Sequence, residues 1–227
     1  MARYERALQE AGARIAAAAR AAGRDPGEVT LLAVSKTFPS AAIRDAHAGG
    51  QRAFGENYVQ EALVKRDELA DLVDLRWVLI GPLQSNKTTV AADVFDRIES
   101  VDRLKVAQRL SSARSADRPP LEVLVQVNIS GEASKSGVAP RDAVPLADAV
   151  SVLPRIAFRG FMGIAAPVDD VAAQRAQFAM LRRCRDEALD RGLNAQVLSM
   201  GMSADLEAAI AEGSTQVRLG TAIFGKR

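Results

Sequence analysis

The sequence has only one cysteine, Cys184, and one histidine, His47, among its 227 residues. An intramolecular disulfide needs two cysteines, so none is expected, and this favours a reducing compartment such as the cytoplasm. Zinc sites built from cysteine and histidine need several such ligands, so no metal site of that type is expected either. Catalysis by a nucleophile and a histidine would depend on His47 alone. This residue lies in a predicted helix, 40–48, and is interpreted as surface or helix-end structure.

Aromatic residues make up only 4% of the chain, and its 30 basic residues are nearly balanced by 28 acidic ones. Because the basic residues are scattered among acidic ones, and few rings are present to stack on bases, we do not expect nucleic-acid binding. No apolar run approaches the roughly 18 residues of a membrane-spanning helix, and the charged N-terminus lacks the apolar segment of a signal peptide. We therefore expect a cytoplasmic protein without a membrane partner.

Short apolar runs alternate with helical patterns along the chain. The predicted strands lie at residues 29–36, 52–55, 76–81, 97–101, 121–129, 156–163, 195–200 and 215–219. Apolar residues at helical spacing predict a leading helix at 3–23 and further helices at 40–48, 57–74, 102–113, 142–153, 169–191 and 203–212. Eight strands, each followed by a crossover and with no long linker, predict that residues 1–227 form one α/β domain. The predicted fold is a (β/α)₈ TIM barrel with an extra N-terminal helix.

Lys36 ends the first predicted strand. A lysine at this position usually marks only the end of the strand, with its ammonium group extending to solvent. The alternative is a desolvated amine with a lowered pKa that condenses with an aldehyde. In TIM barrels the reactive groups lie at the C-terminal ends of the strands, so the other residues at those ends decide between the two.

Two similar segments follow the seventh and eighth predicted strands. The first contains Ser199, Gly201 and Ser203, and the second contains Gly220 and Thr221. Loops at these two places commonly bind phosphate in such barrels. The glycines would expose backbone amides, the hydroxyl groups would donate hydrogen bonds, and Ser203 would cap the helix that follows. The alternative is that both glycines only form tight turns, but the same pattern in both loops favours phosphate.

Arg218 lies inside the last predicted strand, where an unpaired charge would be costly. One interpretation is an arginine in a surface ion pair. The other is a donor that faces the barrel mouth and binds the ring nitrogen of a pyridine cofactor. Arginine keeps its proton, so this ring nitrogen would stay unprotonated, which disfavours carbanion chemistry.

Seven motifs together resemble the pyridoxal phosphate homeostasis protein family, and the resemblance covers nearly the whole chain in the right order. They are Ala33-Val34-Ser35-Lys36, Gly55-Glu56-Asn57-Tyr58-Val59-Gln60-Glu61, Gly81-Pro82-Leu83-Gln84-Ser85-Asn86-Lys87, Val127-Asn128-Ile129-Ser130, Ser134-Lys135-Ser136-Gly137, Leu198-Ser199-Met200-Gly201-Met202-Ser203 and Arg218-Leu219-Gly220-Thr221-Ala222-Ile223-Phe224-Gly225.

The resemblance implies a fold-type III barrel similar to the N-terminal domain of alanine racemase, with pyridoxal 5′-phosphate held as a Schiff base on Lys36. It implies that Arg218 binds the ring nitrogen and that Asn57 lines the cofactor. The implied phosphate site consists of Ser199, Gly201, Ser203, Gly220 and Thr221.

The family is regarded as handling the intracellular supply of this vitamin B6 cofactor, without an established reaction. The resemblance therefore implies a carrier or regulator with no catalytic residues, with apo forms of pyridoxal-phosphate enzymes as possible partners. We expect a monomer, because the barrel is predicted to be complete.

Two other functions remain open. The first is an amino-acid racemase, which needs a second proton-transfer group opposite Lys36. Alanine racemase takes a tyrosine from a further β domain of a partner subunit, whereas this chain stops at Arg227, after the last barrel segment. The two tyrosines, Tyr4 and Tyr58, are not obviously placed for this role. The second is a scaffold that binds protein partners without a cofactor.

Overall fold

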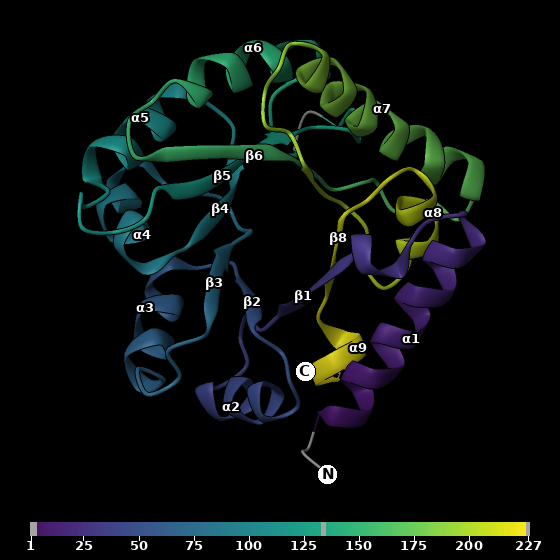
Figure 1. Ribbon diagram of the computed structural model, residues 1–227, viewed down its shortest axis with the longest axis horizontal. Helices are drawn as coiled ribbons and strands as arrows, with labels where there is room; N and C mark the ends of the chain where they lie inside the picture. The colour runs from purple at the N-terminus through teal and green to yellow at the C-terminus, as the bar shows by residue number, and fades with distance from the viewer. Residues whose placement is uncertain (1–3, 133–134, 226–227) are drawn as a thin grey trace.

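The computed structural model describes residues 4–132 and 135–225. Within these ranges eight parallel strands pair in chain order and close into a barrel, with β8 beside β1, so the predicted TIM barrel is confirmed (Figure 1). All eight predicted strands are present. They are β1 Thr30–Val34, β2 Ala53–Glu56, β3 Arg76–Leu79, β4 Arg97–Val101, β5 Leu121–Val127, β6 Ile156–Gly163, β7 Val197–Ser199 and β8 Gln216–Leu219.

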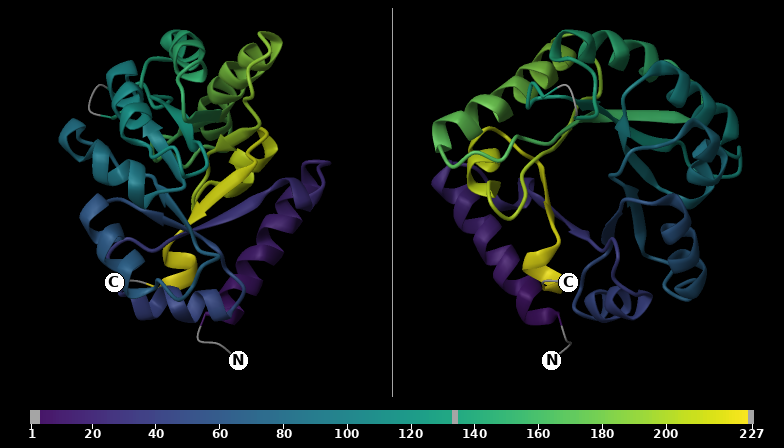
Figure 2. Two further views of the ribbon diagram at one scale, coloured as in Figure 1. Left: turned by 60° about the vertical axis from the view of Figure 1, so that its left-hand side comes forward. Right: turned by 180° about the vertical axis from the view of Figure 1, so that it is seen from behind.

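Helices surround the barrel as an outer layer (Figure 2). They are α1 Glu5–Ala21, α2 Ser40–Ala48, α3 Val59–Glu68, α4 Thr88–Val94, α5 Leu104–Ala113, α6 Pro140–Ser151, α7 Val171–Asp190, α8 Leu206–Ala211 and α9 Thr221–Phe224, with short 3₁₀ turns at Pro26–Glu28 and Ser85–Lys87. The extra helix α1 packs against α8 and α9, and Arg14 donates to both carboxylate oxygens of Glu207 at 2.7 Å. No helix in the described ranges combines the length and the apolar character that crossing a membrane requires.

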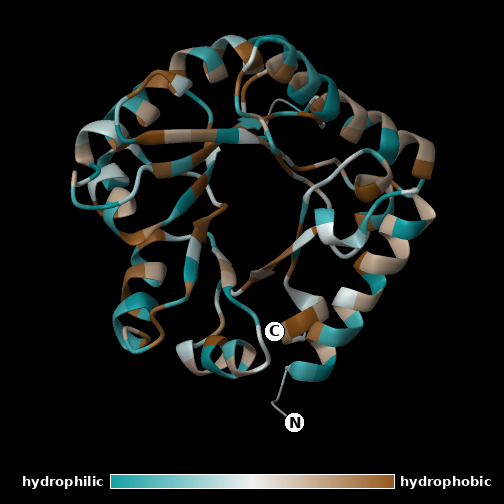
Figure 3. Ribbon diagram, in the orientation of Figure 1, coloured by the Kyte–Doolittle hydropathy of each residue, from teal (hydrophilic) through white to brown (hydrophobic). Residues whose placement is uncertain are grey.

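The main hydrophobic layer lies between the strands and the helices. Figure 3 shows that the surrounding helices carry both hydrophobic and hydrophilic residues, as expected for helices with one buried face. Side chains of a strand alternate between this layer and the barrel interior. On β8, Val217 and Leu219 belong to the hydrophobic layer, so Gln216 and Arg218 point into the barrel.

The same alternation positions the residues of β1 and β4. Ala33 belongs to the outer hydrophobic layer, so Val34 points into the barrel, and the same alternation directs Lys36, two residues on, toward the barrel mouth. On β4, Ile98 packs outward, and Glu99 is therefore an interior residue. The barrel interior thus contains charged groups, which need partners there.

Two predicted helices have different ends in the structure. The helix expected at 57–74 ends at Glu68, and Val73, an apolar residue near the expected end, is 93% exposed. The chain leaves the helix early because turns after Leu69 bring it back to the start of β3. The helix expected at 203–212 begins at Leu206, with Asp205 and not Ser203 at the N-cap position.

The short helices α4 and α9 were not predicted from the sequence. The first turn of α4 begins Thr88-Thr89-Val90, three β-branched residues with low intrinsic helix propensity. Packing decides the conformation here, because Ala91, Ala92 and Val94 are buried. By contrast, Gly192 and Gly213 end α7 and α8 with φ of +79° and +94°, as their positions in the sequence predict.

Candidate functional site

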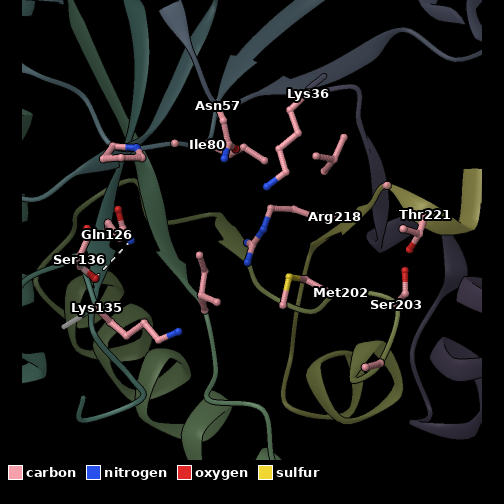
Figure 4. Close-up of a pocket in the computed structure, with 16 residues that line it drawn as sticks. Lys36, Asn57, Ile80, Gln126, Lys135, Ser136, Met202, Ser203, Arg218 and Thr221 are labelled. Carbon is pink, nitrogen blue, oxygen red and sulfur yellow. Dashed lines mark hydrogen bonds between the residues drawn. The ribbon is translucent and has the colours of Figure 1, made fainter. Parts of the chain in front are cut away.

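A cavity of about 550 Å³ opens at the C-terminal ends of the strands (Figure 4). It brings together six of the eight predicted site residues: Lys36, Asn57, Ser203, Arg218, Gly220 and Thr221. These residues come from the ends of β1, β2, β7 and β8, far apart in the chain. The volume is in the range of small-molecule sites, so the cavity is the candidate functional site.

Lys36 follows β1 and extends its amine into the cavity from the barrel wall. In Figure 4 this amine points toward the guanidinium of Arg218. Val34, two residues earlier on the same face of β1, also lines the cavity. The structure therefore favours an inward-facing amine over a strand-exit lysine that reaches for solvent.

A buried polar cluster supports the backbone on the outer side of Lys36. The Ser35 hydroxyl donates to Glu56 Oε1 at 2.6 Å, and Lys65 Nζ donates to the same oxygen at 2.8 Å. Lys65 also donates to the Ser35 carbonyl oxygen at 2.9 Å. Burial raises the pKa of Glu56 above its ordinary value, and the hydrogen bond from Lys65 opposes this rise.

The same cluster fixes the residue after Lys36. Glu61 Oε1 accepts hydrogen bonds from Lys65 Nζ at 2.7 Å and from the Thr37 amide at 2.5 Å. Thr37 has a φ of +66°, which a β-branched residue rarely adopts. Both neighbours of Lys36 are thus held from the side of α3, which directs the Lys36 side chain into the cavity.

Arg218 is buried in the barrel wall and is not part of a surface ion pair. Its Nη1 donates to the carbonyl oxygen of Ser199 at 2.7 Å and to the Ser199 hydroxyl at 2.8 Å, and its Nη2 donates to the carbonyl oxygen of Gly163 at 2.9 Å. Burial lowers the pKa of the Arg218 guanidinium, and the Glu99 carboxylate opposes this shift. The guanidinium is therefore a rigid donor at the base of the cavity.

Asn57 reaches the cavity because the loop after β3 packs directly against its backbone. A Cβ atom at Gly81 would lie 2.3 Å from the Asn57 carbonyl oxygen, so only glycine fits there. Both residues line the cavity.

The loops after β7 and β8 supply polar groups at the cavity rim. Ser203 and Thr221 both line the cavity, and Figure 4 shows their side chains on the same side of it. Among the described residues, the backbone amides of Ser203, Ala204, Thr221 and Ala222 have no hydrogen-bond acceptor. These two loops therefore offer hydroxyl and amide donors to an anion.

Ser199 and Gly201, the other two residues that the resemblance assigns to the phosphate site, do not line the cavity. The Ser199 hydroxyl donates to Glu99 Oε2 at 2.6 Å inside the barrel. Gly201 has a φ of +96°, and a Cβ there would lie 2.6 Å from Cβ of Ala209 in α8. Both residues shape the loop from behind.

The sequence interpretation assigned no role to Gln126, Lys135, Ser136 and Met202, which also line the cavity. Gln126 was detectable, because it interrupts an apolar strand and must face the barrel interior. Its Nε2 donates to the carbonyl oxygen of Ser136 at 3.3 Å, as the dashed line in Figure 4 shows. Lys135 follows β5 in a loop, and only the fold directs its amine toward the cavity (Figure 4).

The single histidine and the two tyrosines lie elsewhere. His47 Nε2 lies 2.6 Å from Asp74 Oδ1 at the end of α2, as its helix-end interpretation implies. Tyr4 packs edge-on against Phe224 with ring centroids 5.2 Å apart, and Tyr58 is 60% exposed. In residues 4–132 and 135–225 no group of three or more histidine, cysteine or acidic residues is placed to hold a metal ion.

Comparison with known proteins connects this geometry to a family. The family model of the alanine racemase N-terminal domain matches residues 7–227. A protein of Pseudomonas aeruginosa named pyridoxal phosphate homeostasis protein is 60% identical over 220 residues, which cover 97% of this chain and 94% of the relative. The chain belongs to the pyridoxal phosphate homeostasis protein family.

Solved structures of similar proteins show the same barrel. A structure described as an unknown protein from Bifidobacterium adolescentis superposes with a TM-score of 0.92 at 40% identity, covering 97% of this chain and 94% of that one. PipY of Synechococcus elongatus, solved with pyridoxal phosphate bound, has a TM-score of 0.81 at 41% identity. The superposition covers 93% of this chain and 100% of the PipY chain.

Proposed function

We propose that this protein binds pyridoxal 5′-phosphate in the cavity at the barrel mouth and acts as a carrier or regulator in pyridoxal phosphate homeostasis. The observation that carries the proposal is the placement of the Lys36 amine and the Arg218 guanidinium in one cavity, beside two loops rich in donors. The names of the relatives and the ligand bound to PipY support it.

The residues present fit this cofactor group by group. Bound pyridoxal phosphate supplies an aldehyde that captures amines and a conjugated ring that can spread negative charge. Lys36 is the amine that we propose forms the Schiff base. Arg218 would donate to the ring nitrogen and, because it keeps its proton, leave that nitrogen unprotonated. Asn57 would line the ring.

For the phosphate group we propose Ser203, Thr221 and the backbone of Gly220 as the binding residues. Hydroxyl groups and unpaired amides at one rim suit a dianion, because hydrogen bonds to a charged acceptor are the strong ones. Ser199 and Gly201 are proposed to act indirectly, by holding the loop and Arg218 in place.

Borohydride reduction of the purified protein tests the site. It should fix a phosphopyridoxyl group on Lys36, found by peptide mapping, and Lys36→Ala should lose both the label and the visible absorbance of the bound cofactor. A label mainly on Lys87 or Lys135 would contradict the assignment, and a colourless protein that binds no pyridoxal phosphate would favour a scaffold.

A racemase is the second candidate, and one observation favours it. Lys135 lines the same cavity as Lys36, so two amines are available for proton transfer. Exchange of the α-proton in deuterated water, together with chiral analysis of several amino acids, separates the two functions. Rapid stereoinversion that disappears in Lys36→Ala and in Lys135→Ala would replace the carrier proposal.

We further propose that the protein acts as a cytoplasmic monomer and delivers its cofactor to apo forms of pyridoxal-phosphate enzymes. Size-exclusion chromatography with light scattering tests the oligomeric state. Transfer is tested by mixing the loaded protein with an apo-transaminase beside a trap for free pyridoxal phosphate. Activation that the trap abolishes would contradict direct delivery.

A further inference from the structure

Two hydrogen-bonded chains cross the barrel interior and meet at Glu99. On one side, Arg218 Nη1 donates to Ser199 Oγ at 2.8 Å, and the Ser199 hydroxyl donates to Glu99 Oε2 at 2.6 Å. On the other side, Arg97 Nη1 donates to Gln216 Oε1 at 2.9 Å, and Gln216 Nε2 donates to Glu99 Oε1 at 2.6 Å. Glu99 is therefore the acceptor at the end of both chains.

The directions of these hydrogen bonds are fixed by their neighbours. Ser199 Oγ receives Arg218 at 2.8 Å and Gln216 Nε2 at 3.0 Å, so its single proton is left for Glu99. Reversing the Gln216 amide would place its NH₂ group against the Arg97 donor. Both oxygens of Glu99 therefore accept hydrogen bonds, as the two oxygens of a carboxylate do.

This carboxylate has an unusual position for a charge. Glu99 is 0% exposed, inside the barrel, and its nearest cationic atom is Arg97 Nη1 at 3.8 Å. A buried charge is retained only with good compensation. Arg97, which lies within ion-pair distance of Glu99, and Arg218, which is linked to Glu99 through Ser199, supply that compensation.

We propose that Glu99 is a positioning residue for Arg218, acting through the hydroxyl group of Ser199. Without the carboxylate, the Ser199 proton is free to turn toward Arg218 Nη1, and a donor then faces a donor. With it, the guanidinium has one orientation and faces the cavity that Lys36 also faces (Figure 4). The inference deepens the proposed function and rests on it, because Arg218 matters there as the partner of the ring nitrogen.

Glu99→Gln tests the proposal, since glutamine keeps the volume but cannot accept on both terminal atoms. We expect roughly ten-fold weaker binding of pyridoxal phosphate, typical of one lost hydrogen bond to a charged group, and a changed ¹⁵N shift of the cofactor ring nitrogen. Affinity for inorganic phosphate should stay the same. Ser199→Ala should reproduce these effects, and the double variant should add little to either single one.

Ser214→Ala is the matched control. Ser214 is a fully buried hydroxyl of the same barrel that lies 2.7 Å from the Met200 carbonyl oxygen and 3.0 Å from the backbone carbonyl oxygen of Gln216, and it makes no hydrogen bond to Arg218, Ser199 or Glu99. It should lower the stability without moving the ring-nitrogen signal. Ser199→Ala decides the question if Glu99→Gln does not fold. Fully additive effects, or an unchanged ring-nitrogen signal in the folded variants, would overturn the role of Glu99.

A measurement without cofactor separates this inference from the proposed function. The side-chain N–H signals of Arg218, assigned by their loss in Arg218→Lys, should exchange slowly with water in the wild type. They should exchange faster in Glu99→Gln and Ser199→Ala but not in Ser214→Ala. If the wild type binds no pyridoxal phosphate, the proposed function fails, and these exchange rates still decide whether Glu99 orders Arg218.

Discussion

The buried lysine behind the barrel wall offers the sharpest test of how Lys36 is positioned. Lys65 Nζ has three hydrogen-bond partners: Glu56 Oε1 at 2.8 Å, Glu61 Oε1 at 2.7 Å and the Ser35 carbonyl oxygen at 2.9 Å. These account for all three of its protons. The perturbation is Lys65→Met, which keeps the length of the side chain and removes its charge.

The expected cost follows from the state in which Glu56 is left. Glu56 is 0% exposed, and its Oε2 already has no hydrogen-bond partner. Breaking a buried ion pair by removing one partner costs about 3–5 kcal/mol, a large part of the roughly 5–15 kcal/mol that stabilises a typical domain. With a urea m-value near 2.5 kcal/mol/M, the midpoint of unfolding should fall by about 1.5 M.

The pH dependence has a definite sign. Burial already raises the pKa of Glu56, and losing Lys65 removes a group that lowers it. A carboxyl group whose pKa is higher in the folded than in the unfolded state destabilises the fold when ionised, and the penalty disappears as pH falls through the folded pKa. The stability difference between Lys65→Met and the wild type should therefore shrink from about pH 8 to about pH 5.

Arg66→Met is the matched control, because it removes a cation from the adjacent position of α3. Arg66 Nη1 lies 2.8 Å from Asp93 Oδ2, but the side chain of Asp93 is 61% exposed, so the loss should be at most about 1 kcal/mol. Urea unfolding of both variants at several pH values is the assay. Equal costs for the two variants, or a Lys65→Met deficit that grows on acidification, would refute the reasoning.

Three further outcomes are expected. Ser203→Ala with Thr221→Val should weaken pyridoxal phosphate by about 1.5–3 kcal/mol per lost contact but leave pyridoxal nearly unaffected, and equal weakening of both ligands in titrations would remove the phosphate site. Burial raises the pKa of the Cys184 thiol to about 11, so iodoacetamide near neutral pH should label the protein only after unfolding, and rapid labelling of the folded protein would contradict this. Gly81→Ala would place a methyl group 2.3 Å from the Asn57 carbonyl oxygen and should cost about 1–3 kcal/mol by thermal unfolding, whereas an unchanged melting temperature would show that this loop is free to move.

The positions of the strands could be predicted from the sequence because each is a short apolar run between helical patterns. The same regularity located five of the six site residues that line the cavity, since strand ends of a parallel barrel meet at one face, whereas Asn57 was assigned only by the resemblance to the family. Helix ends were less predictable. Val73 fits the apolar period of α3, but it is exposed because the chain must turn back to reach β3.

What the sequence by itself determined is the alternating order of elements, and therefore the barrel and the face on which Lys36 and Arg218 lie. Only the tertiary structure decided which polar residues meet inside it. Glu99 and Ser199 are 100 residues apart, and their 2.6 Å hydrogen bond depends on the register of strands that are not neighbours in the sheet. No local pattern encodes such a pair, because the free energy of a buried charge depends on the groups that the closed barrel brings around it.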